Sequence, residues 1–177
     1  MKNKKGISTF QLTVDAMLAA MVALLGYVSI DATVFKITFE SLPLLIGALF
    51  LGPIDGMLIG GIGTLIYQLL RYGFAYTTVL WMLPYILVGL LCGLVAKKNN
   101  FELSKVKIFI ICLISEILIS VLNTGVIYID SKVNHYYYAG IILGSLLLRF
   151  GVAVGKGIVF GIILPYLLTA IKSIKKE

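Results

Sequence analysis

Apolar stretches long enough to cross a bilayer dominate this sequence and leave few folds open to it. They cover roughly residues 11–30, 41–52, 54–70, 79–96, 106–128 and 139–171. A spanning helix needs about 20 mostly apolar residues, and only the second stretch is clearly short. Hydrophobic residues make up 60% of the 177 residues and charged residues 13%, far from the balance of a soluble domain. We therefore predict an all-α membrane protein, a compact bundle of six transmembrane helices forming one domain over residues 1–177.

The second and third stretches meet at a break in the helical pattern. Ser41 and Pro43 suit a helix N-terminus, and Gly52 followed by Pro53 cannot continue a regular helix. Residues 41–70 are therefore either two spans joined by a tight turn or a re-entrant pair. Both alternatives return the chain to the same side of the membrane.

The distribution of basic residues predicts the orientation. Six spans place ten lysines on the side of the termini: Lys2, Lys4, Lys5, Lys97, Lys98, Lys105, Lys107, Lys172, Lys175 and Lys176. Only Lys36, Arg71 and Lys132 fall on the other side. The excess indicates cytoplasmic termini by the positive-inside rule. It also explains the net charge of +7 without a nucleic-acid partner.

Two cations lie within the last apolar stretch, at Arg149 and Lys156. Each costs at least ~2.5 kcal/mol near the centre of a spanning helix. Counted from opposite faces at 1.5 Å per residue, Glu116 and Arg149 both lie ~15 Å deep, which predicts an ion pair. That pair is either structural or the wall of a pocket in which Arg149 also receives a carboxylate. We expect Lys156 to pair with Asp15 or Asp55, or to extend to the cytoplasmic interface.

Small residues recur at helical spacing and predict close helix contacts. The pairs are Ala16/Ala20, Ala19/Ala23, Gly52/Gly56/Gly60, Gly89/Gly93, Gly151/Gly155 and Gly157/Gly161. In lipid, such faces let helices approach closely. Most are expected to hold the bundle together, and the alanine face of the first span is a candidate dock for a separate membrane partner.

Motifs for enzyme chemistry are absent from the sequence. The segment "GVAVGKG" (151–157) has three residues between its glycines and Gly157 after the lysine, so it is not a phosphate-binding loop. Cys92 and Cys112 lie apart in apolar runs, and the single His135 cannot build a metal site. We predict no metal, no cofactor and no enzymatic activity.

Two segments carry a resemblance to a known family, the substrate-binding S components of energy-coupling factor (ECF) vitamin transporters. "ITFESLPLLIGALFLGPIDGMLIGGIGTLIYQLL" (37–70) has a proline and glycine layout similar to the folate, pantothenate and riboflavin members. "AMLAAMVA" (16–23) resembles the alanine face by which the first helix of the family contacts the coupling subunit. The chain departs from the pattern at Leu51, which stands between Phe50 and Gly52-Pro53.

The resemblance implies a subunit in a prokaryotic plasma membrane that binds a vitamin from outside and works with a transmembrane coupling subunit and two ATPases. Its loop 31–40 would act as a lid. The implied binding residues are Phe35, Lys36, Glu40, Gln68, Arg71, Tyr72, Trp81, Glu116, Asn123, Tyr128, His135 and Arg149. The implied docking residues are Ala16, Ala19, Ala20 and Ala23. The cations favour a folate or pantothenate type of vitamin, and the aromatic residues are compatible with riboflavin.

Two other functions are weighed against this one. A self-sufficient secondary carrier could use Glu116 as a proton site, although the chain lacks the internal repeat typical of such carriers. An intramembrane enzyme is the least favoured, because the sequence offers neither a metal-ligand cluster nor a nucleophile with its base.

Overall fold

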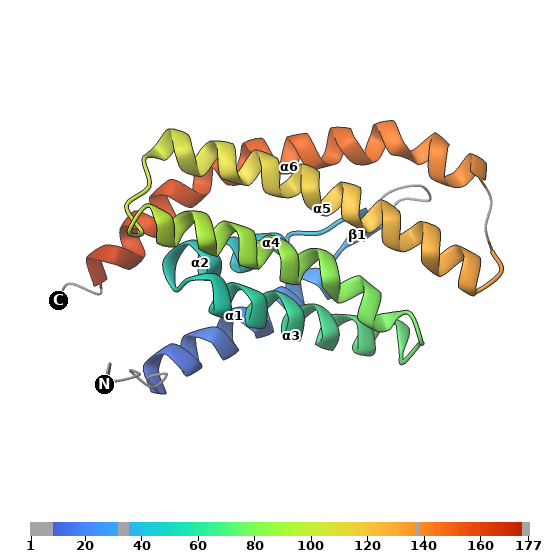
Figure 1. Ribbon diagram of the computed structural model, residues 1–177, viewed down its shortest axis with the longest axis horizontal. Helices are drawn as coiled ribbons and strands as arrows, with labels where there is room; N and C mark the ends of the chain where they lie inside the picture. Colours follow the sequence, from blue (N-terminus) through green and yellow to red (C-terminus); the bar gives the residue numbers. More distant parts are fainter. Residues whose placement is uncertain (1–8, 32–35, 137–138, 175–177) are drawn as a thin grey trace.

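The computed structural model describes residues 9–31, 36–136 and 139–174 (Figure 1). Its helices are α1 (Thr9–Tyr27), α2 (Ser41–Phe50), α3 (Pro53–Tyr72), α4 (Thr78–Lys98), α5 (Lys105–Val133) and α6 (Ala139–Ile174). Two short strands, β1 (Ile30–Asp31) and β2 (Lys36–Ile37), pair antiparallel after α1. Apart from this small ladder, which the sequence did not predict, the described part of the chain is helical as expected.

Within the described residues, five helices are long and apolar enough to cross a membrane. They are α1, α3, α4, α5 and, within α6, the stretch Gly144–Ser173. The second predicted span, 41–52, corresponds to α2, which has ten residues and is therefore only ~15 Å long, half of a bilayer core. Apart from Leu42 and Phe50 its residues are buried. This stretch is a core helix surrounded by protein.

The break between α2 and α3 is a tight turn. Gly52 has φ = 130°, a conformation that costs a glycine little and other residues much more. Pro53 then opens α3, where its missing N–H leaves no hydrogen bond unmade. Of the two predicted arrangements for residues 41–70, the structure shows a half-length helix joined by a tight turn to a full-length one.

The loops sort to two ends of the bundle (Figure 1). One end holds the start of α1, the α2–α3 turn, the α4–α5 loop and the end of α6. Lys97, Lys98, Lys105, Lys107 and Lys172 all lie there, and we call it the basic end. The opposite end carries the β1–β2 ladder and the α3–α4 and α5–α6 connections, and we call it the hairpin end.

Glycines set the contacts between α3 and α4. A Cβ added at Gly89 would lie 2.4 Å from the backbone oxygen of Gly56, so only hydrogen fits between the two helices. On α6, a Cβ at Gly157 would lie 2.8 Å from Leu113 Cα, which fixes how α6 packs on α5. By contrast, a Cβ at Gly151 would meet nothing within 4 Å. The predicted packing role is thus confirmed for Gly89 and Gly157, whereas Gly151 makes no such contact.

This difference gives a matched pair of substitutions. Gly89→Ala should force α3 and α4 apart and lower stability by about 1–3 kcal/mol, the usual cost of overpacking. Gly151→Ala should be neutral or slightly stabilising, because alanine is the better helix former. Thermal unfolding of the purified chain in detergent measures both. Equal melting temperatures for the two variants would contradict the α3–α4 packing.

Candidate functional site

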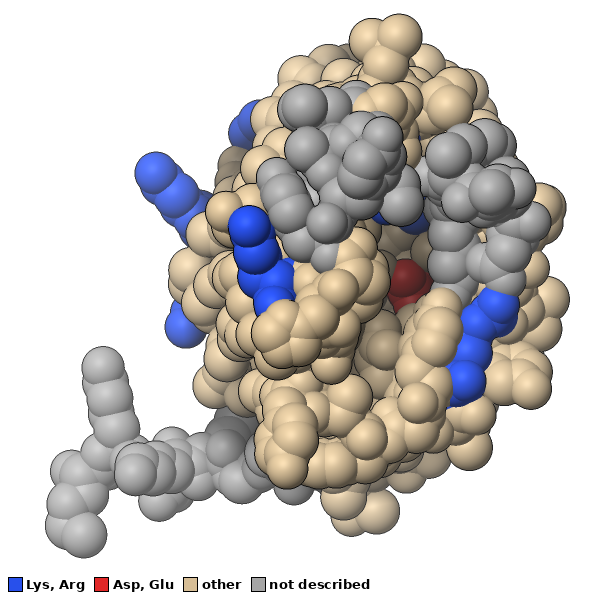
Figure 2. Space-filling model, turned by 90° about the vertical axis from the view of Figure 1, so that its right-hand side faces the viewer, with Lys and Arg blue, Asp and Glu red and all other residues tan. Residues whose placement is uncertain are grey.

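A cavity of about 540 Å³ occupies the interior of the bundle and extends to the hairpin end. Figure 2, which views that end, shows the surface hollowed there, with acidic atoms visible inside. The size lies within the range of small-molecule sites in proteins. The polar and aromatic residues of its lining are Thr38, Glu40, Tyr67, Gln68, Tyr72, Thr77, Thr78, Trp81, Tyr85, Glu116, Ser120, Asn123, Asp130, Asn134, Tyr136, Arg149 and Lys156.

A buried ion pair forms part of the cavity wall. Lys156 Nζ lies 2.8 Å from Glu116 Oε2, with the two side chains 12% and 2% exposed. The same ammonium donates to Ser41 Oγ at 3.2 Å, at the first residue of α2. A charge at this depth is tolerated only when it is paired and hydrogen-bonded. The three groups therefore tie α2, α5 and α6 together.

This pairing corrects two predictions. The sequence predicted Glu116 with Arg149, and Lys156 with Asp15 or Asp55; the structure pairs Glu116 with Lys156. The error came from the length of α5, which runs to Val133 and not to about residue 128. With Gly157 packed on Leu113, Glu116 lies level with the turn of α6 that carries Lys156.

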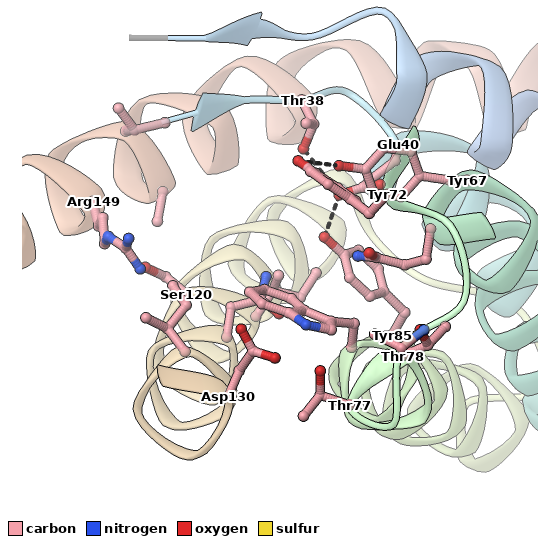
Figure 3. A pocket seen from close by; sticks show the side chains of 18 of the residues that line it. Thr38, Glu40, Tyr67, Tyr72, Thr77, Thr78, Tyr85, Ser120, Asp130 and Arg149 are labelled. Carbon is pink, nitrogen blue, oxygen red and sulfur yellow. Dashed lines mark hydrogen bonds between the residues drawn. The ribbon is translucent and has the colours of Figure 1, made fainter. Parts of the chain in front are cut away.

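Arg149 is left in the cavity wall without an acidic partner among the described residues. Eight residues before Gly157 on α6, it lies level with the part of α5 around Ser120, and Figure 3 shows the two side chains next to each other. Its Nε is buried and has no hydrogen-bond partner within the described part of the chain, and the same is true of Glu116 Oε1 and Asn123 Oδ1. A buried polar atom without a partner costs about 1–3 kcal/mol. Three such atoms in one wall indicate a cavity built to bind a polar guest.

On the side of the cavity formed by α4 and the start of α2, Glu40 is held by hydroxyl groups. Thr38 Oγ1 donates to Glu40 Oε1 at 3.0 Å, and the Tyr85 hydroxyl donates to the same oxygen (Figure 3). Glu40 is 3% exposed. Because α2 is short, this extended segment enters the interior of the bundle, where a backbone outside regular structure is accepted only when protein surrounds it.

A second acidic group lies nearer the hairpin end. Asp130 Oδ1 accepts from Asn134 Nδ2 at 3.0 Å, and Oδ2 accepts from the Tyr136 hydroxyl. Partial burial and the hydrogen bond to Asp130 raise the pKa of Tyr136 to about 12, so this hydroxyl keeps its proton and donates. Asp130 is 9% exposed and lines the cavity.

Comparison with known proteins identifies the family. Residues 10–174 match the family model of the ECF transporter, substrate-specific component. The chain belongs to this family. It is thus a multi-pass membrane protein and the substrate-binding (S) component of an ECF importer, which associates with coupling and ATPase subunits. The family is one of transporter components and not of enzymes. A comparison with curated proteins gives no match.

Most residues predicted for the S component's binding site lie in the cavity. Those in its lining are Glu40, Gln68, Tyr72, Trp81, Glu116, Asn123 and Arg149. Phe35 lies outside the described residues, as does the side chain of Lys36, whose backbone belongs to β2. The lining also contains residues that were not predicted, among them Thr38, Tyr67, Tyr85, Asp130 and Lys156.

Three predicted residues lie outside the lining. Arg71 donates to the Tyr27 carbonyl at 2.7 Å and to Ser29 Oγ at 2.8 Å, so it joins the end of α3 to the end of α1. Tyr128 is 48% exposed. His135 is exposed at the turn after α5, with φ = 58°.

The four alanines predicted for docking divide between two faces of α1. Ala19 and Ala23 are buried, and a Cβ at Gly63 of α3 would meet the Ala19 carbonyl oxygen at 2.7 Å. Ala16 and Ala20 are exposed. The first pair therefore packs α1 on α3, and only the second is available to a partner.

The ion pair gives a stability test. Glu116→Gln should lower the free energy of unfolding by about 3 kcal/mol, because it leaves the Lys156 ammonium buried without a counter-charge. Lys156→Met should have a comparable cost, and Glu116→Leu combined with Lys156→Met should recover much of the loss. Denaturant unfolding in detergent micelles measures the three variants. Strictly additive losses would show that the two groups do not act as a pair.

Proposed function

We propose that this S component captures a vitamin at the hairpin end, which faces outward, and delivers it through a coupling subunit and two ATPases to the cytoplasm of a prokaryotic cell. The lysines of the basic end support this orientation by the positive-inside rule. The cavity lining reaches Thr77 and Tyr136, both at the hairpin end, as capture from outside requires. Residues 1–177 would act as one domain.

The observation that carries the proposal is the guanidinium of Arg149. It lies in the cavity wall with a buried Nε that has no partner among the described residues. The planar guanidinium binds carboxylates through two parallel hydrogen bonds. A vitamin of the folate or pantothenate type would supply the carboxylate, and Trp81 with the cavity tyrosines would pack against it. Riboflavin is the alternative guest on aromatic content.

The ion pair speaks against the secondary-carrier alternative. A proton-coupling residue must be free to exchange its proton during transport, whereas Glu116 is engaged at 2.8 Å by Lys156 within the protein. The same contact belongs to the packing of α2, α5 and α6. These contacts support a structural role for Glu116, in which it holds the helices together and shapes the cavity, over a role in proton coupling.

The structure also supports two further features implied by the family resemblance: loop 31–40 as a lid over the cavity, and the exposed alanines of α1 as the contact surface for the coupling subunit. Thr38 and Glu40, at the end of loop 31–40, line the cavity, so movement of this loop would open or close it. Ala16 and Ala20 form a shallow exposed strip on α1, where small side chains permit close helix contact in lipid.

Substitution of the two arginines tests the cavity. Native mass spectrometry of the purified chain first identifies a co-purifying small molecule. Folate, pantothenate and riboflavin are then titrated by fluorescence of Trp81, the only tryptophan and a cavity residue. Arg149→Ala should weaken the best binder more than tenfold, about 1.4 kcal/mol.

Arg71→Ala is the matched control, because Arg71 contacts Tyr27 and Ser29 and does not line the cavity. Its affinity should stay within threefold of the wild type. A folded Arg149→Ala protein with unchanged affinity would remove Arg149 from the site.

Substitutions on the two faces of α1 test whether Ala16 and Ala20 contact the coupling subunit. Ala20→Leu should abolish vitamin uptake by the assembled importer in liposomes while leaving binding to the isolated chain intact, because the larger side chain blocks close approach. Ala23→Leu should instead lower the melting temperature, since Ala23 is buried. Normal uptake by the Ala20→Leu protein would place the dock elsewhere.

A further inference from the structure

Two charged groups of opposite sign in the cavity wall, Arg149 and Asp130, have no ion-pair partner among the described residues. Among the described lining residues, Glu116 and Lys156 neutralise each other. Arg149 has no acidic partner there, and Asp130 has no cationic one: its carboxylate oxygens accept from the neutral donors Asn134 and Tyr136. These two bonds use about half of the lone-pair positions of a carboxylate. Asp130 can therefore accept further hydrogen bonds from a guest.

The two groups lie at different depths. The packing of Gly157 on Leu113 brings Arg149 level with α5 near Val121, and Asp130 lies nine residues further along α5 toward the hairpin end. At 1.5 Å per residue the two levels are about 14 Å apart. Figure 3 shows Arg149 and Asp130 on separate parts of the cavity wall, with Ser120 drawn between them.

An uncompensated carboxylate in such a wall is costly. Asp130 is 9% exposed, and burial of a charge without a counter-charge is strongly unfavourable in a low-dielectric interior. A positively charged or N–H-rich group of a guest would offset this cost at Asp130, as an anionic group would at Arg149.

We infer that the cavity binds a dipolar guest, which enters with its anionic end toward Arg149 and keeps a cationic or N–H-donating end at Asp130. This inference rests on the proposed function and narrows it. A folate fits, because it carries an N–H-donating pterin ring with an amino group at one end and carboxylates at the other. Pantothenate has an anionic end without an amino group, and riboflavin has neither charge.

A panel of vitamins tests this on the purified full chain. Two probes have both ends of the proposed guest: folate has carboxylates and a neutral, N–H-donating pterin, and pyridoxamine 5′-phosphate has a phosphate and an ammonium. Pantothenate is only anionic, thiamin is only cationic and riboflavin is neutral. The first two are called the dipolar probes. We expect a dipolar probe to bind the wild type at least tenfold more tightly than any of the other three, as measured by Trp81 fluorescence and calorimetry.

Asp130→Asn supplies the second measurement. It removes the charge and keeps an oxygen that accepts from Asn134 or Tyr136, so it should weaken the dipolar probe more than tenfold and leave pantothenate binding within threefold. If the Asp130→Asn protein keeps its pantothenate affinity and its melting temperature, the loss of affinity for the dipolar probe reflects recognition by Asp130 and not a structural defect. Glu102→Gln is the control, because this acid is exposed at the basic end and should leave every affinity unchanged.

The outcomes separate the two proposals. If pantothenate, thiamin or riboflavin binds the wild type most tightly, or if Asp130→Asn leaves a dipolar probe unaffected, vitamin capture stands and the dipolar inference is overturned. If no probe binds the wild type, both proposals fail. If the Asp130→Asn protein does not fold, the relative affinities of the five probes for the wild type still test whether the cavity prefers a dipolar guest.

Discussion

The ion pair of Glu116 and Lys156, with Ser41 beside it, fixes how α2, α5 and α6 meet inside the bundle. Two charges deep in a membrane protein must meet each other at hydrogen-bond distance, and here they do so at 2.8 Å with Ser41 as a further partner. The contact joins the middles of α5 and α6 to the first residue of α2. Because Glu116 pairs with Lys156, it is not the partner of Arg149, which lies in the cavity wall without an ion-pair partner among the described residues.

The short α2 explains how a cavity of this size exists in a bundle of few helices. A helix of ten residues fills half the thickness of the bundle, and the extended segment before it brings Thr38 and Glu40 inside, where Tyr85 and Thr38 hydroxyls bond the Glu40 carboxylate. The space between this segment, α4, α5 and α6 is the candidate binding site. Glycine contacts between α3 and α4 hold the wall in place without filling it.

Much of the site could be predicted because intramembrane polar residues are few. Glu116, Asn123 and Arg149 interrupt apolar runs, the family resemblance implied all three as binding residues, and all three line the cavity. Asp130 was missed because it lies at the end of a run, where an acid is typical of a loop. Tyr85 was missed because a tyrosine within an apolar run resembles packing, and only its contact with Glu40 shows its polar role.

The amino-acid pattern alone was enough to locate the stretches that form the five long apolar helices, the break at Gly52-Pro53 and the small-residue faces at Gly56 and Gly89, because hydropathy and residue size are local properties. The cation that meets Glu116 depended on how α5 and α6 pack against each other. Arg149 and Lys156 are seven residues apart on α6, about two turns. Because α5 runs to Val133 and not to about residue 128, the turn of α6 that carries Lys156 lies level with Glu116. The tertiary structure also decided that Ala19 and Ala23 face α3 while Ala16 and Ala20 face outward, since the rotation of a helix is set by its neighbours.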